Sequence, residues 1–173
     1  LDKEQRPLSN DERQMLLQYS GFGGLKCVLN PANSLADVGQ WAKSELELFP
    51  MVAELHKVIR DNTHTEQEYK DYVNSIKHSV LTAFYTPKEV VEVIADVLKD
   101  NTISVDKFLD PSAGMGEFSK AFHAVNLNTQ HTSFEKDLLT GKMLSYINPD
   151  DKVNIEGFEN IEARYNGYFD VIS

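Results

Sequence analysis

Cysteine, long apolar runs and positive charge are scarce in this sequence, and each shortage excludes a class of protein. The single cysteine, Cys27, excludes an internal disulfide, and the five histidines have no spacing that would build a metal site with it. No stretch approaches the roughly 18 consecutive apolar residues that a membrane-spanning helix needs, and the amino terminus does not resemble a secretion signal. We therefore expect a cytoplasmic chain with no metal centre and no membrane partner.

The charge balance is acidic, with 17 Lys and Arg against 27 Asp and Glu and a net charge of -10. Proteins that hold duplex DNA neutralise its phosphates with Lys and Arg. Any contact with DNA is therefore expected to come from regions outside this chain. The sequence begins at Leu1 without Met and ends at Ser173 inside an apolar run, which favours a piece excised from a longer protein.

Residues 1–78 are predicted to form a helical region, because apolar residues recur there at helical spacing. The expected helices cover 11–19, 44–60 and 63–77. Pro50 is expected to kink or restart the second helix. The Gly-rich stretch 20–26 superficially resembles a phosphate-binding loop, but it lacks the Gly-Lys-Ser/Thr ending and follows a helix. We interpret it as a helix-terminating turn whose glycines take positive φ.

Residues 79–173 change to short apolar runs that alternate with amphipathic helices, which is typical of βαβ units and a mostly parallel sheet. The 41% hydrophobic content is enough for a core in this α/β region. The expected strands cover 107–109, 131–134, 152–155 and 168–172, and the expected helices between the first three cover 117–125 and 137–146.

The strongest motif lies at 108–118, Phe-Leu-Asp-Pro-Ser-Ala-Gly-Met-Gly-Glu-Phe, where a strand passes through a turn into a helix. Gly114 and Gly116 would let a ligand approach the backbone, and Asp110 at the strand end would accept a hydrogen bond from it. A dinucleotide fingerprint needs a third glycine, so the motif favours a ligand with a cationic amino-acid end over a diphosphate. A plain structural turn would also use these glycines.

A second motif, 83–89, predicts the start of a helix. Thr86 suits the N-cap, Pro87 the first helical position, and Glu89 would complete a capping box. The aromatic residues before it, Phe84 and Tyr85, could also form one wall of a pocket at the helix amino terminus.

Two weaker signals follow later strands. Glu135, 25 residues beyond Asp110, could accept hydrogen bonds from both hydroxyls of a ribose, although a solvated strand-end charge would look the same. Phe158, after the third expected strand, could lie against a purine ring or pack in the core.

Taken in order, these motifs resemble those of the gamma-type adenine-N6 DNA methyltransferases across 79–173. Within that group the closest likeness is to the very large proteins of bacterial mobile elements that join a methyltransferase to a Swi/Snf-type helicase. Those proteins also carry a Tyr-x-Gly-aromatic-Gly-Gly-Leu stretch, here at 19–25. The resemblance implies a Rossmann-like methyltransferase fold with a partial, mostly parallel sheet, preceded by an α-helical N-terminal extension, and a helicase-like domain in the same full-length chain.

The resemblance also implies roles in binding S-adenosyl-L-methionine. The methionine moiety would be held by Tyr85 and Thr86, its amino and carboxylate groups by Asp110, Ala113, Gly114 and Gly116, the ribose by Glu135 and the adenine by Phe158. Asp170 in the fourth strand would lead into the catalytic loop. The family often has an acidic residue where this chain has Gly157, and the sequence leaves open whether Glu156 or Glu159 substitutes for it.

The family's catalytic Asn/Asp-Pro-Pro-aromatic loop is not in this sequence. The Asn-Pro pairs at 30–31 and 148–149 lack the second proline and the aromatic residue, and we interpret both as turns. We therefore assign no catalytic residue and expect the piece alone to be inactive, although the full-length protein would be an enzyme.

Three alternatives stay open at this point. A protein glutamine or RNA methyltransferase would share the same acid-and-glycine loop. A non-catalytic methyltransferase-like module could serve for docking in a larger DNA-processing protein. A nicotinamide oxidoreductase is disfavoured by the glycine spacing. A sheet cut after four strands would also leave an open edge through which the piece could associate.

Overall fold

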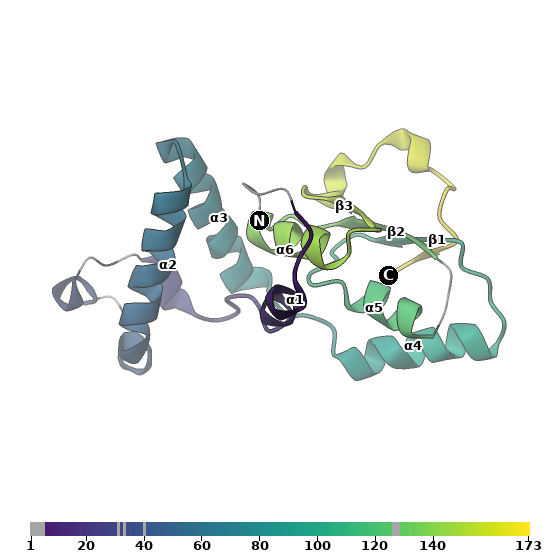
Figure 1. Cartoon of the computed structure of the whole chain (residues 1–173), viewed down its shortest axis with the longest axis horizontal. Helices are drawn as coiled ribbons and strands as arrows, with labels where there is room; N and C mark the ends of the chain where they lie inside the picture. Colours follow the sequence, from purple (N-terminus) through teal and green to yellow (C-terminus); the bar gives the residue numbers. More distant parts are fainter. Residues whose placement is uncertain (1–5, 31, 33, 40, 126–128) are drawn as a thin grey trace. The chain divides into compact units, whose positions relative to one another are not determined.

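The computed structural model describes residues 6–30, 32, 34–39, 41–125 and 129–173 (Figure 1). The chain divides into two compact units. We call residues 20–83 the helical unit, and residues 1–19 together with 84–173 the sheet unit. The boundary expected between residues 78 and 79 falls inside helix α3 (Glu66–Thr82).

The helical unit contains two helices, α2 (Phe49–Asn62) and α3, preceded by three short 3-10 turns, η1 (Lys26–Leu29), η2 (Leu35–Asp37) and η3 (Lys43–Leu48). Pro50 lies in the first turn of α2, where its missing N–H costs nothing, so the predicted restart of the helix is confirmed. The core of the unit is formed by buried residues that include Cys27, Val28, Trp41, Val52, Ile76 and Val80.

The Gly-rich turn of the helical unit has the predicted positive φ at two of its three glycines, and Gly23 is the exception. Gly21 and Gly24 have φ of 76° and 78°, a region that glycine enters without strain. The Phe22 and Gly24 N–H groups donate to Ser79 Oγ and Val80 O, at 3.1 Å each, and so hold the turn against α3. Pro31, which belongs to one of the two predicted Asn-Pro turns, lies outside the described residues.

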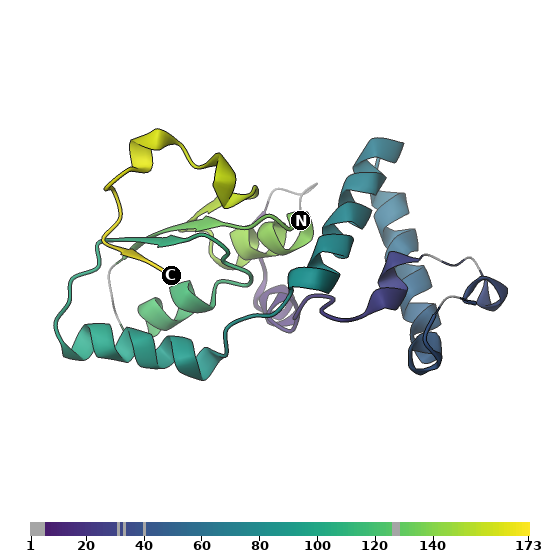
Figure 2. The same cartoon turned by 180° about the vertical axis from the view of Figure 1, so that it is seen from behind.

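The sheet unit is an α/β structure with a four-stranded parallel sheet in the order β3-β2-β1-β4 (Figures 1 and 2). The strands are β1 (Lys107–Asp110), β2 (Gln130–Phe134), β3 (Lys152–Asn154) and β4 (Val171–Ile172). Its helices are α1 (Asn10–Leu16), α4 (Lys88–Asp100), α5 (Glu117–Ala124) and α6 (Leu138–Ile147), with 3-10 turns η4 (Phe158–Asn160) and η5 (Ala163–Tyr165).

All four predicted strands are present, as are the two helices expected between the first three. The fourth strand is shorter than expected, because Tyr168 closes a turn with Tyr165 and the pairing with β1 begins only at Val171. The turn expected at Asn148–Pro149 is confirmed, since Asp151 N donates to Asn148 O at 3.2 Å. The general α/β class is therefore correct, and the parallel sheet is as predicted.

The capping prediction for α4 is wrong. Pro87, with ψ of 136°, is the N-cap, and the helix begins at Lys88. No side-chain capping hydrogen bond forms, so the expected capping box of Thr86 and Glu89 is not present. Instead, the N–H groups of Val90 and Val91 donate to Pro87 O.

The core of the sheet unit lies where α4 and α5 pack on one face of the sheet. Phe108 from β1 contacts Phe122 from α5, with ring centroids 4.8 Å apart. Val91 and Ala95 bring α4 into the same cluster. Figures 1 and 2 show these helices on one side of the sheet and the segment between β3 and β4 on the other. In the described part of the chain, no helix is long and apolar enough to cross a membrane.

Candidate functional site

The carboxyl ends of β1 and β2 carry the two acids that the sequence singled out. The register pairs Asp110 with Ser133, two residues before Glu135, so the two acids lie at the same edge of the sheet. β1 has β2 on one side and β4 on the other, so the chain reverses its direction of travel across the sheet beside β1. Ligands of open α/β sheets bind at such switch points, outside the carboxyl ends of the strands.

Asp110 is the last residue of β1 and is only 5% exposed. Its Oδ1 accepts a hydrogen bond from the Ser112 N–H at 3.2 Å. Burial raises the pKa of this carboxyl, and the hydrogen bonds from Ser112 and Ser173 oppose that shift only in part. The fold therefore places this carboxyl where its ionised form is disfavoured.

Glu135 follows β2 and connects it to the glycine loop. One carboxylate oxygen accepts from the Gly114 N–H at 2.8 Å, and the other accepts from the Asp137 N–H at 2.8 Å. A backbone bond from Ala113 N to Phe134 O, at 2.9 Å, reinforces the link. Burial is the main cause of a raised pKa at Glu135, to which the charges of Asp137 and Asp110 add.

Gly114 and Gly116 both take positive φ, 52° and 76°. A Cβ on Gly114 would lie 2.7 Å from ring atoms of Tyr85, and a Cβ on Gly116 would lie 2.7 Å from Leu144 Cδ1. Neighbours within the chain therefore already require glycine at both positions. The contact between Gly114 and Tyr85 also places the motif at 83–89 against the motif at 108–118.

Tyr85 is half-buried over this loop. Burial raises the pKa of its hydroxyl, the nearby Thr140 side chain lowers it, and the charges of Glu135 and Asp137 raise it further. Five of the expected binding residues thus meet at one edge of the sheet: Tyr85, Asp110, Ala113, Gly114 and Glu135. Thr86 is exposed, and Gly116 lies at the N-cap of α5 against α6.

Phe158 is 36% exposed and packs edge-to-face on Phe134, with ring centroids 5.5 Å apart. Phe158 was expected either to pack in the core or to lie against a purine ring. It packs on Phe134, and because Phe134 directly precedes Glu135, this position is compatible with both interpretations. Beside Gly157, where the resembling family often has an acid, lies the Glu159 carboxylate. Glu159 forms an ion pair with Lys136 at 2.7 Å.

Asp170 was expected to lie in the fourth strand, but it directly precedes β4. Its Oδ2 accepts from the N–H groups of Asp106 and Lys107, at 3.0 and 2.8 Å, and so joins the starts of β4 and β1. This is the opposite end of β1 from Asp110.

The sequence reasoning missed Asp137, which is 6% exposed. Its Oδ1 caps α6 by accepting from the Thr140 N–H at 2.6 Å. Its Oδ2 is buried and has no hydrogen-bond partner among the described residues. The Asp-x-x-Thr pattern at a helix start was the available signal, but it predicts a cap and says nothing about the second oxygen.

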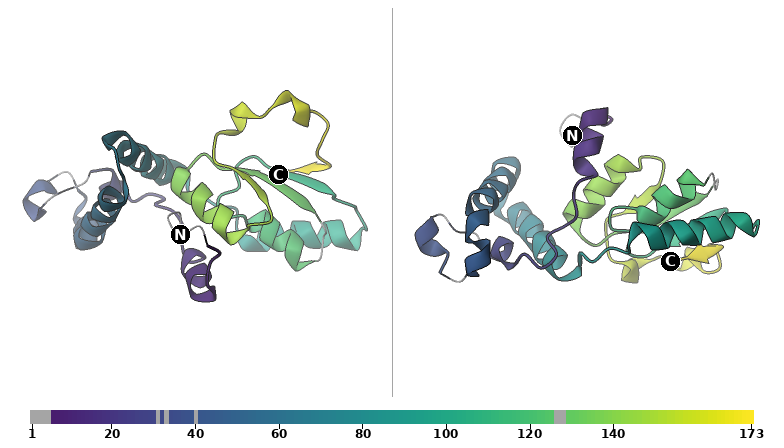
Figure 3. Two further views of the ribbon diagram at one scale, coloured as in Figure 1. Left: turned by 45° about the horizontal axis from the view of Figure 1, so that its top comes forward. Right: turned by 90° about the horizontal axis from the view of Figure 1, so that it is seen from below.

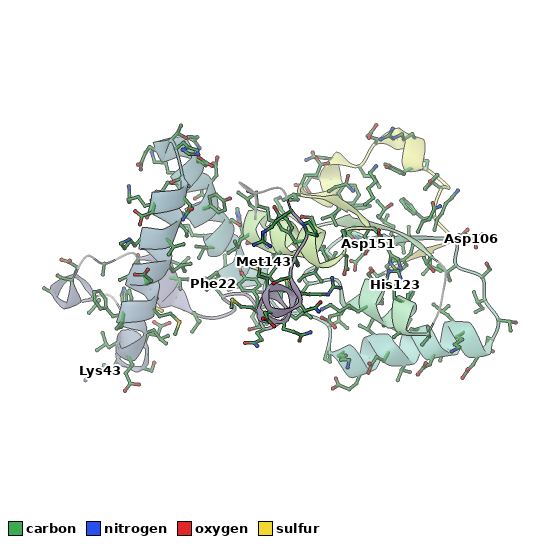
Figure 4. The ribbon with its side chains drawn as sticks, viewed as in Figure 1. Phe22, Lys43, Asp106, His123, Met143 and Asp151 are labelled. Carbon is green, nitrogen blue, oxygen red and sulfur yellow. The ribbon has the colours of Figure 1, made fainter. Side chains whose placement is uncertain are left out.

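A separate polar cluster lies between α5 and β3. The Asp151 carboxylate accepts from Ser119 Oγ at 2.5 Å and lies 3.7 Å from His123 Nε2 (Figure 4). The His131 ring, buried in β2, lies 5.2 Å from that of His123, and burial lowers the pKa of His131 to about 4. No described group of three or more His, Cys, Asp and Glu side chains is arranged to hold a metal ion.

Comparison with known proteins gives little to identify the chain. No family model matches it, and no solved structure matches it. Over 81 residues, or 47% of the chain, it is 30% identical to the Defense against restriction protein B of Escherichia phage P1. That match spans about 4% of the length of the phage protein.

Proposed function

We propose that this chain is the S-adenosyl-L-methionine-binding part of a DNA adenine-N6 methyltransferase of Rossmann-like fold. The observation that carries the proposal is the meeting of Asp110, Gly114 and Glu135 at the carboxyl edge of a parallel sheet. The bound cofactor would supply an activated methyl group. Asp110 would accept a hydrogen bond from its ammonium group, and Glu135 would accept hydrogen bonds from its ribose hydroxyls.

The electrostatics favour a cationic ligand over a diphosphate. Asp110 and Glu135 both have a pKa that burial raises, and none of the groups that shift these values is a cation. A ligand ammonium would offset the cost of burying the ionised carboxylates. A diphosphate would be repelled by them and by Glu117 in the first turn of α5.

The target assignment depends on the resemblance and on one detail of the comparisons. The name of the phage relative concerns defence against restriction. Modification of DNA bases is one way in which DNA escapes a restriction nuclease, and adenine methylation belongs to that chemistry. We assign the catalytic loop, the contacts with DNA and a helicase-like domain to the longer polypeptide, and the location of the protein to the cytoplasm.

A non-catalytic methyltransferase-like module is the second candidate, and a specific observation favours it. Both Glu135 oxygens already accept backbone hydrogen bonds, and Tyr85 fills the space beside Gly114. Such a loop is complete without a ligand. A protein or RNA methyltransferase would use the same cofactor site and differs only in parts that this chain does not contain.

Calorimetric titration of this chain with S-adenosylmethionine, S-adenosylhomocysteine and NAD⁺ separates these functions. We expect both methionine-derived ligands to bind, NAD⁺ not to bind, and Asp110→Asn to weaken S-adenosylmethionine about tenfold or more. Glu54→Gln, at an exposed position of α2, is the matched control and should bind as the wild type does. Absence of binding in the wild type would favour the non-catalytic module.

A further inference from the structure

Helix α4 has two apolar faces, and only one of them is used in the sheet unit. Val91 and Ala95 are fully buried against α5 and β1. A second set, Val90, Val93, Ile94 and Val97, is 49%, 60%, 39% and 51% exposed. Its spacing of i, i+3, i+4 and i+7 places the four side chains on one continuous face. We call this set the α4 stripe. Figure 3 (right) views the sheet unit with α4 in the foreground.

The composition of the α4 stripe is unfavourable for an exposed helix face. Three of its four residues are valine, and valine and isoleucine restrict their side-chain rotamers in a helix. An exposed position that serves only the helix is better filled by Ala, Glu, Lys or Arg. The stripe therefore gains from being buried against something.

An acidic row runs along one border of the α4 stripe. Glu89, Glu92, Asp96 and Asp100 follow each other at helical spacing; the first three directly precede Val90, Val93 and Val97, and Asp100 continues the row one turn beyond Val97. The Lys88–Glu92 pair, at 3.3 Å, is exposed and neutralises only one end of the row. A complementary surface would combine apolar side chains with a parallel row of positive charge.

We propose that the α4 stripe and its acidic row form a docking surface for an amphipathic helix of a partner protein, with Lys or Arg along one border of its apolar face. A helix fits because its own side chains repeat at the spacing of the stripe and pack in ridges along α4. A second copy of this chain that paired its α4 in the antiparallel direction would fit poorly, because the two acidic rows would lie along the same edge.

The test uses the whole chain and synthetic helical peptides of about 18 residues, roughly five turns. One peptide carries leucines on one face with lysines along its border, and the second has glutamates in place of the lysines. Fluorescence anisotropy gives the dissociation constants. We expect the lysine peptide to bind, and the double variant Val93→Ser with Val97→Ser to weaken it about tenfold or more. Val58→Ser, at a 47% exposed position of α2, should leave binding unchanged.

A charge swap distinguishes docking from general attraction to an acidic protein. The double variant Glu89→Lys with Asp96→Lys should transfer the preference to the glutamate peptide, and Glu54→Lys should not. Absence of binding, equal binding of both peptides, or unchanged binding in the serine double variant would overturn the proposal. If the wild type sediments as a dimer and the serine double variant as a monomer, the proposal is overturned, because the stripe would then bind a second copy of this chain.

Discussion

The two units differ in whether their buried polar groups have hydrogen-bond partners. In the helical unit, His56 uses both ring nitrogens, with Tyr69 Oη at 3.1 Å and Val28 O at 3.0 Å, and Trp41 Nε1 donates to Asn30 O. In the sheet unit, Asp137 Oδ2 and His131 Nε2 are buried without a hydrogen-bond partner among the described residues. Polar groups that satisfy one another serve the fold, whereas buried polar atoms without a hydrogen-bond partner need another reason to be present.

The largest expected loss of stability lies in the helical unit. His56→Leu would leave the Tyr69 hydroxyl and the Val28 carbonyl buried without partners, which should cost about 2–4 kcal/mol of unfolding free energy. Urea unfolding followed by the fluorescence of Trp41, the single tryptophan and part of this core, measures it. His64→Leu, at an exposed position, is the control, and equal losses in both variants would show that the His56 bonds contribute nothing.

The next effect is a pH dependence in the sheet unit. Because the folded-state pKa of His131, about 4, lies below the ordinary value of 6.5, the unfolded chain takes up a proton first. Its contribution to stability is complete above about pH 6.5 and is lost as the pH falls towards 4, by about 2 kcal/mol at pH 5. Asp110 and Glu135 act in the opposite direction, because burial raises the pKa of each carboxyl.

The His131→Phe variant isolates this contribution, since the ring lies among the aromatic side chains of Phe108 and Phe122. We expect the stability difference between wild type and variant, measured by urea unfolding with circular dichroism, to change by about 2 kcal/mol between pH 7 and pH 5. A difference that is constant with pH would mean that His131 titrates alike in both states.

A smaller effect is expected at the glycine loop. Gly114→Ala should destabilise the sheet unit by about 1–2 kcal/mol, because the residue has positive φ and its Cβ would meet the Tyr85 ring. Gly39→Ala, whose Cβ would have no neighbour within 4 Å, should cost less than about 0.5 kcal/mol. In a double-mutant cycle, Gly114→Ala should destabilise the Tyr85→Ala variant less than the wild type, because the steric clash with the ring is removed. Additive losses of unfolding free energy in the double variant would contradict the contact.

The smallest effect is expected at Asp137. Asn is an equally good N-cap and keeps the oxygen that accepts from Thr140 N, so Asp137→Asn should change the unfolding free energy by less than about 0.5 kcal/mol. If the unpartnered oxygen serves a cationic ligand, the same variant should bind S-adenosylmethionine more weakly. Loss of stability without loss of binding would assign Asp137 to the fold alone.

Local patterns in the sequence were sufficient for the α/β class, the four strands and the positive φ of Gly21 and Gly24. Each of these depends on apolar spacing or on one residue type in a turn. The sequence also identified Asp110 and Glu135, because acids at the ends of parallel strands meet at one edge.

Contacts between distant segments could not be predicted in this way. The hydrogen bond from Gly114 to Glu135 and the contact of Tyr85 with Gly114 join motifs that are 21 and 29 residues apart. The assignment of residues 6–19 to the sheet unit depends on contacts of α1 with α6. The N-cap of α4 was misplaced because Thr86, Pro87 and Glu89 fit the pattern of a helix that starts at Pro87, whereas the extended ψ of Pro87 delays the start to Lys88.

The proposed function implies that Asp110 is buried for a ligand and not for the fold. Denaturant unfolding of the wild type and of Asp110→Asn, each with and without S-adenosylmethionine, tests it most directly. We predict that the variant without ligand is at least as stable as the wild type, since burial disfavours the ionised carboxyl, and that only the wild type gains stability when the ligand is added. A variant that is less stable without ligand, yet gains as much from it as the wild type does, would contradict the claim.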